Sequence, residues 1–117
     1  MAQGSGVPFR LRRRPTYEHA DTFNQETLAG DKVLIVKDAC YQLLDPGGSN
    51  RDVTLPAEGN NKGAWFWIQN RADAAENLVV KDDGAATIGT LNQNEAALFL
   101  CDGTSWVNTG ILSASLS

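Results

Sequence analysis

The sequence predicts an all-β protein: a single β-sandwich or jelly-roll-like domain with an extended N-terminal arm. Three observations support this fold class. Short runs of apolar, β-branched and aromatic residues recur at intervals of roughly 8–12 residues. Gly, often beside Asp or Asn, separates these runs and favours tight turns. No segment has the repeating apolar stripe of an amphipathic helix, so neither a helical nor an α/β fold is expected.

Length and composition are those of one globular domain. The chain has 117 residues, of which 42% are hydrophobic and 21% charged. We divide it into an extended basic arm over residues 1–31, a β-sandwich body over residues 32–110 and a short C-terminal tail over residues 111–117. No apolar run approaches the roughly 20 residues of a membrane helix, and no apolar segment follows the N-terminal Arg residues as in a secretory signal. We therefore expect no membrane partner.

The arm is predicted to be extended. A proline on each side of its Arg cluster biases the neighbouring backbone away from helix. Val7, Phe9 and Leu11 alternate with other residues, which is strand-like spacing. The segment has too few apolar residues to fold alone, but it could add as a strand to the edge of another sheet. A floppy tail is the alternative, and a short helix over residues 22–28 is left open.

The first half of the body contains four predicted strands. Residues 32–37 (Lys-Val-Leu-Ile-Val-Lys) form an apolar, β-branched run. Residues 40–44 end at Asp45-Pro46-Gly47-Gly48, a strong turn signal. Residues 52–55 form a short strand that a proline stops, and residues 64–69 (Ala-Trp-Phe-Trp-Ile-Gln) have the highest β-propensity of the chain.

The second half of the body is predicted to form two strand pairs around glycine-containing turns. The first pair is residues 77–81 and 86–89, with Asp82-Asp83-Gly84 between them. The second pair is residues 96–101 and 105–108, joined at Asp102-Gly103, the strongest hairpin signal in the sequence.

Four aromatic residues are candidates for the core or for an oligomer interface. Trp65 and Trp67 share one face of their strand and Phe66 lies on the other, because side chains alternate along a strand. One face must be core. The other is core as well, a subunit contact or a sugar-stacking surface. Trp106, in the last predicted hairpin, belongs to the same group.

Charge is divided unevenly between the arm and the rest of the chain. Residues 1–14 hold four Arg and no acid, whereas residues 15–117 hold 14 acidic and 6 basic residues, a net charge of −8. A cationic arm is attracted to an acidic surface. An acidic protein partner fits better than nucleic acid, which the body would repel, so no direct nucleic-acid contact is expected. The candidate binding residues of the arm are Phe9, Arg10, Leu11, Arg12, Arg13 and Arg14.

No catalytic or cofactor site is predicted. The single His, His19, lies in the arm, a poor platform for catalytic geometry. Asp45, Asp82, Asp83 and Asp102 lie in Gly-containing turns, where Asp bonds its own backbone. Cys40 and Cys101 lack the spacing of a zinc site, and we expect buried free thiols, with a disulfide as the alternative. We therefore expect no enzyme, no cofactor and no metal.

Residues 41–110 resemble a type of small β domain found in structural proteins of tailed phages, especially capsid decoration (cement) proteins. Five segments carry the resemblance. They are Leu44-Asp45-Pro46-Gly47-Gly48, Arg51-Asp52-Val53-Thr54-Leu55-Pro56, Trp65-Phe66-Trp67-Ile68-Gln69-Asn70, Leu78-Val79-Val80-Lys81-Asp82 and Phe99-Leu100-Cys101-Asp102-Gly103-Thr104-Ser105-Trp106. These are turn and core residues, and none of them is a catalytic signature.

The resemblance implies a homotrimer on the outer capsid surface of a virion, made in the host cytoplasm. It also implies an arm that lies across subunits of the major capsid protein and stabilises the head. The alternative is a tail-associated fibre, neck or hub protein that is structural or binds a receptor or glycan. Its sugar contacts would come from Trp65, Trp67 or Trp106.

Overall fold

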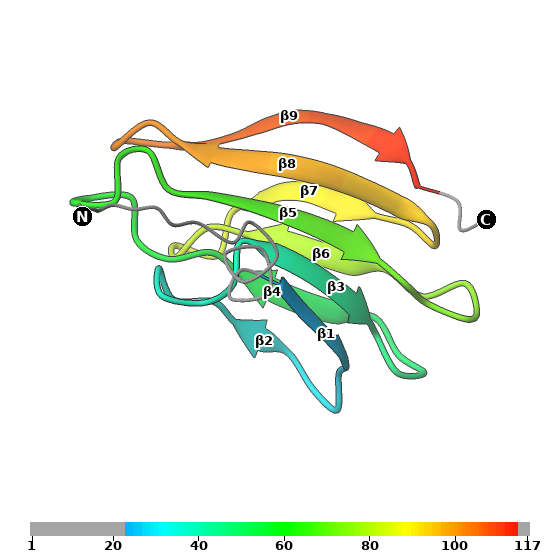
Figure 1. The fold of residues 1–117 in the computed structure, drawn as a ribbon. Helices are drawn as coiled ribbons and strands as arrows, with labels where there is room; N and C mark the ends of the chain where they lie inside the picture. The colour runs from blue at the N-terminus through cyan, green and yellow to red at the C-terminus, as the bar shows by residue number, and fades with distance from the viewer. Residues whose placement is uncertain (1–22, 115–117) are drawn as a thin grey trace, which may run out of the picture.

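The computed structural model describes residues 23–114, which form two β-sheets and no helix (Figure 1). None of these residues lies in a helix long and apolar enough to cross a membrane. The strands, in chain order, are β1 (Phe23–Thr27), β2 (Lys32–Val33), β3 (Tyr41–Asp45), β4 (Arg51–Thr54), β5 (Trp65–Asn70), β6 (Leu78–Lys81), β7 (Thr87–Leu91), β8 (Glu95–Cys101) and β9 (Trp106–Ser113).

The two sheets pack as the layers of a sandwich (Figure 1). One sheet has the strand order β1-β3-β5-β8-β9, and the other has the order β2-β4-β6-β7. The predicted all-β sandwich is therefore confirmed. Within it, strands β1 to β6 alternate between the sheets, so that β1, β3 and β5 pair in parallel, as do β2, β4 and β6. In this topology the chain crosses repeatedly from one sheet to the other. It differs from the antiparallel Greek key of a jelly roll.

Both hairpins predicted in the second half of the body are present. Strands β6 and β7 pair antiparallel, and so do β8 and β9. In the β8–β9 turn, Asp102 Oδ1 accepts hydrogen bonds from the backbone N–H groups of Thr104 (2.9 Å) and Ser105 (2.7 Å). Asp82 does the same in the β6–β7 turn, accepting from Gly84 and Ala86 at 2.9 Å each. Strand propensity together with turn chemistry predicts these pairings.

The core lies between the sheets and is almost wholly apolar. Phe66, Ile68 and Phe99 project from the five-stranded sheet, and Val53 and Val80 from the four-stranded one; each exposes 1% or less of its surface. Burial of this apolar surface is the main driving force for holding the two sheets together. The remaining buried members of the core are Leu28, Leu34, Leu44, Leu55, Leu78, Leu91, Ala97, Cys101 and Trp106.

The first strand of the body begins earlier than the boundary at residue 32 indicates. Residues 23–27, assigned to the arm, form β1, and Leu28 is in the core with its N–H donating to the Asp45 carbonyl at 2.7 Å. The helix left open over residues 22–28 is absent from the described part, residues 23–28. Hydrogen bonding along the edge of β3 selects the extended form. At the other end, β9 includes residues 111–113, which were assigned to the tail.

The apolar run at residues 32–37 forms a much shorter strand than predicted. Only Lys32 and Val33 pair with β4, and the Leu34 N–H still donates to the Thr54 carbonyl at 2.8 Å. The chain then turns, with the Ile35 N–H bonded to Asp38 Oδ2 at 2.8 Å. Val33, Ile35 and Val36 are left 50–69% exposed at this edge of the four-stranded sheet.

Candidate functional site on the outer face of the five-stranded sheet

Strand β5 presents aromatic side chains to both sides of its sheet. Phe66 and Ile68 point into the sandwich and are buried, whereas Trp65 and Trp67 point outward and are half-buried. The alternation of side chains along the strand separates the two sets, as the sequence indicates. The adjacent aromatic residues thus serve two purposes: Phe66 builds the core, and the two indoles build an outer surface.

The indoles line an apolar hollow on this outer surface. Tyr41 on β3 lies opposite Trp67, while Leu98 and Leu100 on β8 lie opposite Trp67 and Trp65. Together these five side chains line an open hollow of about 350 Å³. The hollow therefore draws on three neighbouring strands and rests on the backbone of the sheet rather than on loops.

Apolar residues continue around the hollow. Phe23, which pairs with Tyr41, is 53% exposed, and Val107, which pairs with Leu100, is 43% exposed. Leu112, on the same edge strand as Val107, is 56% exposed. Exposed apolar side chains grouped on one side of a sheet are typical of a binding or assembly site. We call this surface, comprising Phe23, Tyr41, Trp65, Trp67, Leu98, Leu100, Val107 and Leu112, the aromatic face.

The polar groups of the hollow are few. Among its lining residues, only the Tyr41 hydroxyl and the two indole N–H groups can form hydrogen bonds. One of them, Trp67 Nε1, is directed to Gln69 Oε1 at 3.4 Å. A surface with so few donors and acceptors suits an apolar partner, because each unpaired polar group of a ligand buried there would cost free energy.

The remaining predicted aromatic residue, Trp106, lies in the core with Phe66. Its side chain is 6% exposed, its ring centroid is 6.0 Å from that of Phe66, and its indole Nε1 donates to the Pro56 carbonyl at 2.8 Å. Of the four aromatic candidates, Phe66 and Trp106 are therefore core residues, and Trp65 and Trp67 belong to the aromatic face. The arm residues Phe9, Arg10, Leu11, Arg12, Arg13 and Arg14 lie outside the described residues, as does His19.

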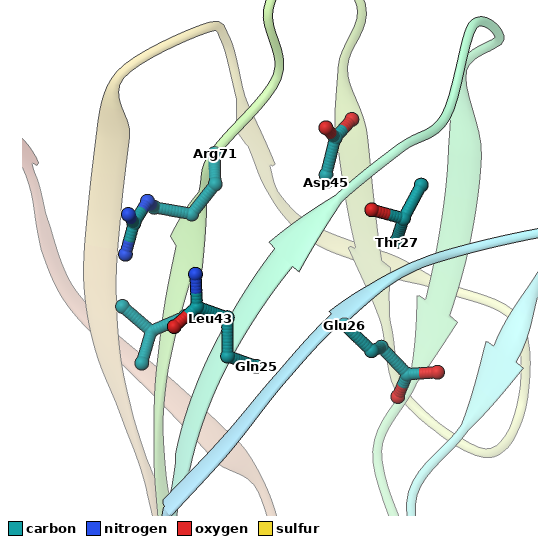
Figure 2. Close-up of a pocket in the computed structure, with 6 residues that line it drawn as sticks. All are labelled: Gln25, Glu26, Thr27, Leu43, Asp45 and Arg71. Atoms are coloured by element: carbon teal, nitrogen blue, oxygen red, sulfur yellow. The ribbon is translucent and has the colours of Figure 1, made fainter.

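A second hollow, of about 480 Å³, lies at the end of strands β1 and β3 (Figure 2). Gln25, Glu26, Thr27, Leu43, Asp45 and Arg71 line it. The Glu26 carboxylate is bound by Lys32 Nζ at 2.6 Å and by Asn24 Nδ2 at 3.0 Å. These bonds, chiefly the one from Lys32, lower the pKa of Glu26, because they stabilise its charged form. Arg71 points away from Asp45 in this view (Figure 2).

Both cysteines are free thiols. Cys40 is half-buried and Cys101 is buried in the core, where its Sγ lies 3.6 Å from the Glu58 carbonyl oxygen. The predicted buried free thiol is confirmed for Cys101; Cys40 is also free rather than in a disulfide, but the prediction that it is buried was wrong.

Comparison of the sequence with known proteins found no relative: no protein-family model matches the chain, and no curated protein matches it.

Proposed function

We propose that this chain is a non-enzymatic structural protein of a phage virion, a capsid decoration protein that assembles through its aromatic face and is anchored by its N-terminal arm. The observation that carries the proposal is the aromatic face, which sits on a body of acidic charge. Residues 23–114 contain 12 acidic and 6 basic residues, a net charge of −6. Charge of this size keeps the bodies from associating indiscriminately, so association is favoured where apolar side chains are grouped, as on the aromatic face.

The aromatic face is suited to contact between copies of the chain. It is rigid, because three hydrogen-bonded strands carry the side chains of its hollow, and it is rich in Trp, Tyr and Leu. Aromatic residues are enriched at the centres of protein interfaces. The trimeric state itself is taken from the resemblance to decoration proteins. A trimer would present three arms together, so that weak binding by each arm adds up to strong attachment.

The arm would leave the body beside this interface. Phe23 is the first residue of β1 and belongs to the aromatic face, so residues 1–22 join the body at its margin. In the proposed assembly, Arg10, Arg12, Arg13 and Arg14 pair with acidic groups of the major capsid protein on the outer capsid surface. Phe9 and Leu11 fill apolar grooves there.

The experiment that tests the proposal measures binding of the full chain to undecorated phage heads. Replacing Arg10 and Arg12 together by Ala should lower head occupancy at a fixed concentration by about tenfold or more, since two charge-assisted contacts are lost per arm. The matched control replaces two exposed body lysines, Lys37 and Lys62, by Ala, which changes the net charge equally. Equal loss in both variants, or no binding by the unaltered chain, would reject arm-directed decoration.

A tail-associated module that binds a receptor glycan is the second candidate. The observation in its favour is that Trp65 and Trp67 line an open hollow, since sugar rings stack on exposed aromatic rings. Saturable quenching of tryptophan fluorescence by a host-surface oligosaccharide, lost in Trp67→Ser and kept in a variant of the exposed Ile35, would favour this candidate. The scarcity of polar groups in the hollow is the reason for ranking it second.

A further inference from the structure

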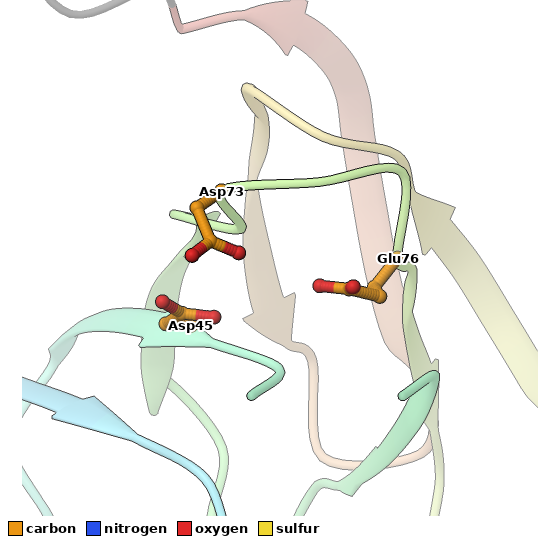
Figure 3. A group of neighbouring side chains, drawn as sticks. All are labelled: Asp45, Asp73 and Glu76. Carbon is orange, nitrogen blue, oxygen red and sulfur yellow. The ribbon is translucent and has the colours of Figure 1, made fainter. Parts of the chain in front are cut away.

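Three carboxylates, one from the end of β3 and two from the loop between β5 and β6, meet at one end of the five-stranded sheet. Asp45 ends β3, while Asp73 and Glu76 lie in the loop between β5 and β6, and the three side chains place one oxygen each within 4.8 Å of one another (Figure 3). Parallel pairing explains the meeting, because Leu44 is paired with Asn70 and the next residues of both strands leave the same edge of the sheet.

One of these carboxylates has a buried oxygen with no partner. Glu76 Oε1 exposes less than 1 Å² and accepts no hydrogen bond, and it is the sole buried side-chain oxygen or nitrogen in this condition among residues 23–114. The Glu76 carboxylate is directed toward Asp45 and Asp73 (Figure 3). A buried charged oxygen without a donor is costly, and two neighbouring carboxylates raise that cost further. A cation between the three groups would remove both penalties.

The loop that carries Asp73 and Glu76 is held firmly in place. The Asn70 side chain, which is fully buried, donates to the carbonyls of Glu76 and Leu91 at 2.9 Å each and accepts from the Ala72 N–H at 2.8 Å. Asn50, in the turn after β3, accepts from the Asn77 N–H at 2.9 Å and ties the two loops together. The three carboxylates are thus brought together before any ligand arrives.

We propose that Asp45, Asp73 and Glu76 bind a divalent cation of the size of Ca²⁺. Ca²⁺ accepts oxygen ligands in flexible geometry, whereas Mg²⁺ demands near-ideal octahedral geometry and gives up its water reluctantly. Three carboxylates from the end of β3 and the β5–β6 loop, with oxygens within 4.8 Å of one another, suit the less demanding ion. Three carboxylates leave several of its coordination positions to water, so the affinity should be of the order found in extracellular modules, a Kd of roughly 10⁻⁴–10⁻³ M.

Arg71 is the competing source of positive charge. It follows Asn70 directly, and its N–H donates to the Leu44 carbonyl at 2.8 Å. No ion pair joins Arg71 to the three carboxylates within the described part of the chain, and its guanidinium points away from Asp45 (Figure 2). Arg71 therefore does not neutralise the three carboxylates, and an external cation could do so. This inference is independent of the proposed function.

The test is calorimetric titration of the chelator-treated full chain with CaCl₂ and, separately, with MgCl₂, followed by thermal unfolding with and without each ion. Saturable binding of one Ca²⁺, tighter than that of Mg²⁺, and a rise in Tm with Ca²⁺ are expected. Asp73→Asn, which alters an exposed residue, should weaken Ca²⁺ binding by about tenfold or more. Glu76→Gln should abolish the Ca²⁺-dependent rise without lowering the Tm of the metal-free protein, because the unpartnered buried charge is gone.

The matched control is Asp83→Asn, an exposed acidic residue of the β6–β7 turn outside the cluster, which should bind Ca²⁺ as the unaltered chain does. Three results would overturn the proposal. They are the absence of any Ca²⁺-dependent heat or Tm rise in the unaltered chain, unaltered Ca²⁺ binding in both Asp73→Asn and Glu76→Gln, and an equal loss in Asp83→Asn. The first result, combined with a lower Tm in Arg71→Gln, would identify Arg71 as the counter-ion instead.

Discussion

Tyr41 meets Trp65 edge to face on the outer side of the five-stranded sheet, with ring centroids 5.5 Å apart and ring planes at 86°. The two residues are diagonal neighbours, because Tyr41 pairs in register with Trp67. An edge-to-face pair contributes about 0.5–1.5 kcal/mol beyond the area it buries. The contact fixes the orientation of the two rings relative to each other, so the hollow that they line is formed in the isolated protein.

The first prediction concerns assembly through the aromatic face. In the proposed assembly, Trp67→Ser should convert the oligomer to monomer in sedimentation analysis, because truncating an aromatic hot-spot residue of an interface costs about 2 kcal/mol or more in binding. The circular dichroism spectrum should be unchanged. Ile35→Ser, an exposed apolar residue at the other sheet, is the control and should leave the oligomer intact. A monomeric parent protein, or an oligomeric Trp67→Ser variant, contradicts the prediction.

The second prediction separates the two faces of β5 by stability. Phe66→Ala should lower the free energy of unfolding by about 3–5 kcal/mol, because it leaves a cavity in the core. Trp65→Ala, on the outer face, should lower it by about 1 kcal/mol, mainly through loss of the contact with Tyr41. Urea unfolding at a protein concentration where the chain is monomeric gives both values. Similar costs at the two positions would mean that the outer face is packed like a core.

The third prediction concerns the buried amide of Asn70. Asn70→Ala removes the partner of three backbone groups, those of Ala72, Glu76 and Leu91, and should destabilise the protein by about 3 kcal/mol or more. Asn92→Ala, at an exposed loop position, should change the stability by less than about 0.5 kcal/mol. Chemical denaturation checks both. A small effect at Asn70 would show that water or a rearranged loop replaces its hydrogen bonds.

The strands and hairpins of the body could be predicted largely from local sequence signals. The β-branched run of β6 and the Asp-Gly turns after β6 and β8 act over a few residues, where propensity and turn chemistry decide. The alternation of the first six strands between the two sheets could not be predicted in this way. Parallel pairing joins residues far apart in the chain, such as Phe23 with Tyr41, and the sequence between them does not specify which strands become neighbours.

Local sequence signals also predict the aromatic face and the carboxylate cluster only in part. Alternation predicts that Trp65 and Phe66 point to opposite sides, but which side is core depends on the packing of the second sheet. Asp45 and Glu76 are 31 positions apart, and no local motif connects them. Only the parallel pairing of β3 with β5 brings their loops together. Strand β1 was missed because Asn24, Gln25 and Glu26 are polar, and backbone bonds to β3 rather than side-chain burial determine its conformation.

The fourth prediction is a pH dependence from Glu26. Its pKa in the folded protein is below the ordinary value of 4.5, so its bond to Lys32 stabilises the fold fully above pH 4.5 and is lost as the pH falls through the lowered pKa. The side chain of Glu26 is 38% exposed, so the contribution should be about 0.5 kcal/mol. Glu26→Gln and Lys32→Gln should each flatten the acidic limb of the stability profile. A limb as steep as that of the parent in both variants would assign it to other carboxylates.

The fifth prediction uses two neighbouring glycines with different surroundings. Gly47 and Gly48 both have positive φ, 75° and 95°, so Ala at either position should cost about 1–2 kcal/mol in backbone strain. A Cβ at Gly48 would meet open space, whereas one at Gly47 would collide with the carbonyl oxygen of Leu28. Leu28 can move little, since its N–H is bonded to the Asp45 carbonyl at 2.7 Å and its side chain is in the core. Gly47→Ala should therefore be less stable than Gly48→Ala by about 1 kcal/mol. Urea unfolding midpoints measure this difference. Equal midpoints would mean that the backbone between β1 and β3 shifts to accommodate the added methyl group.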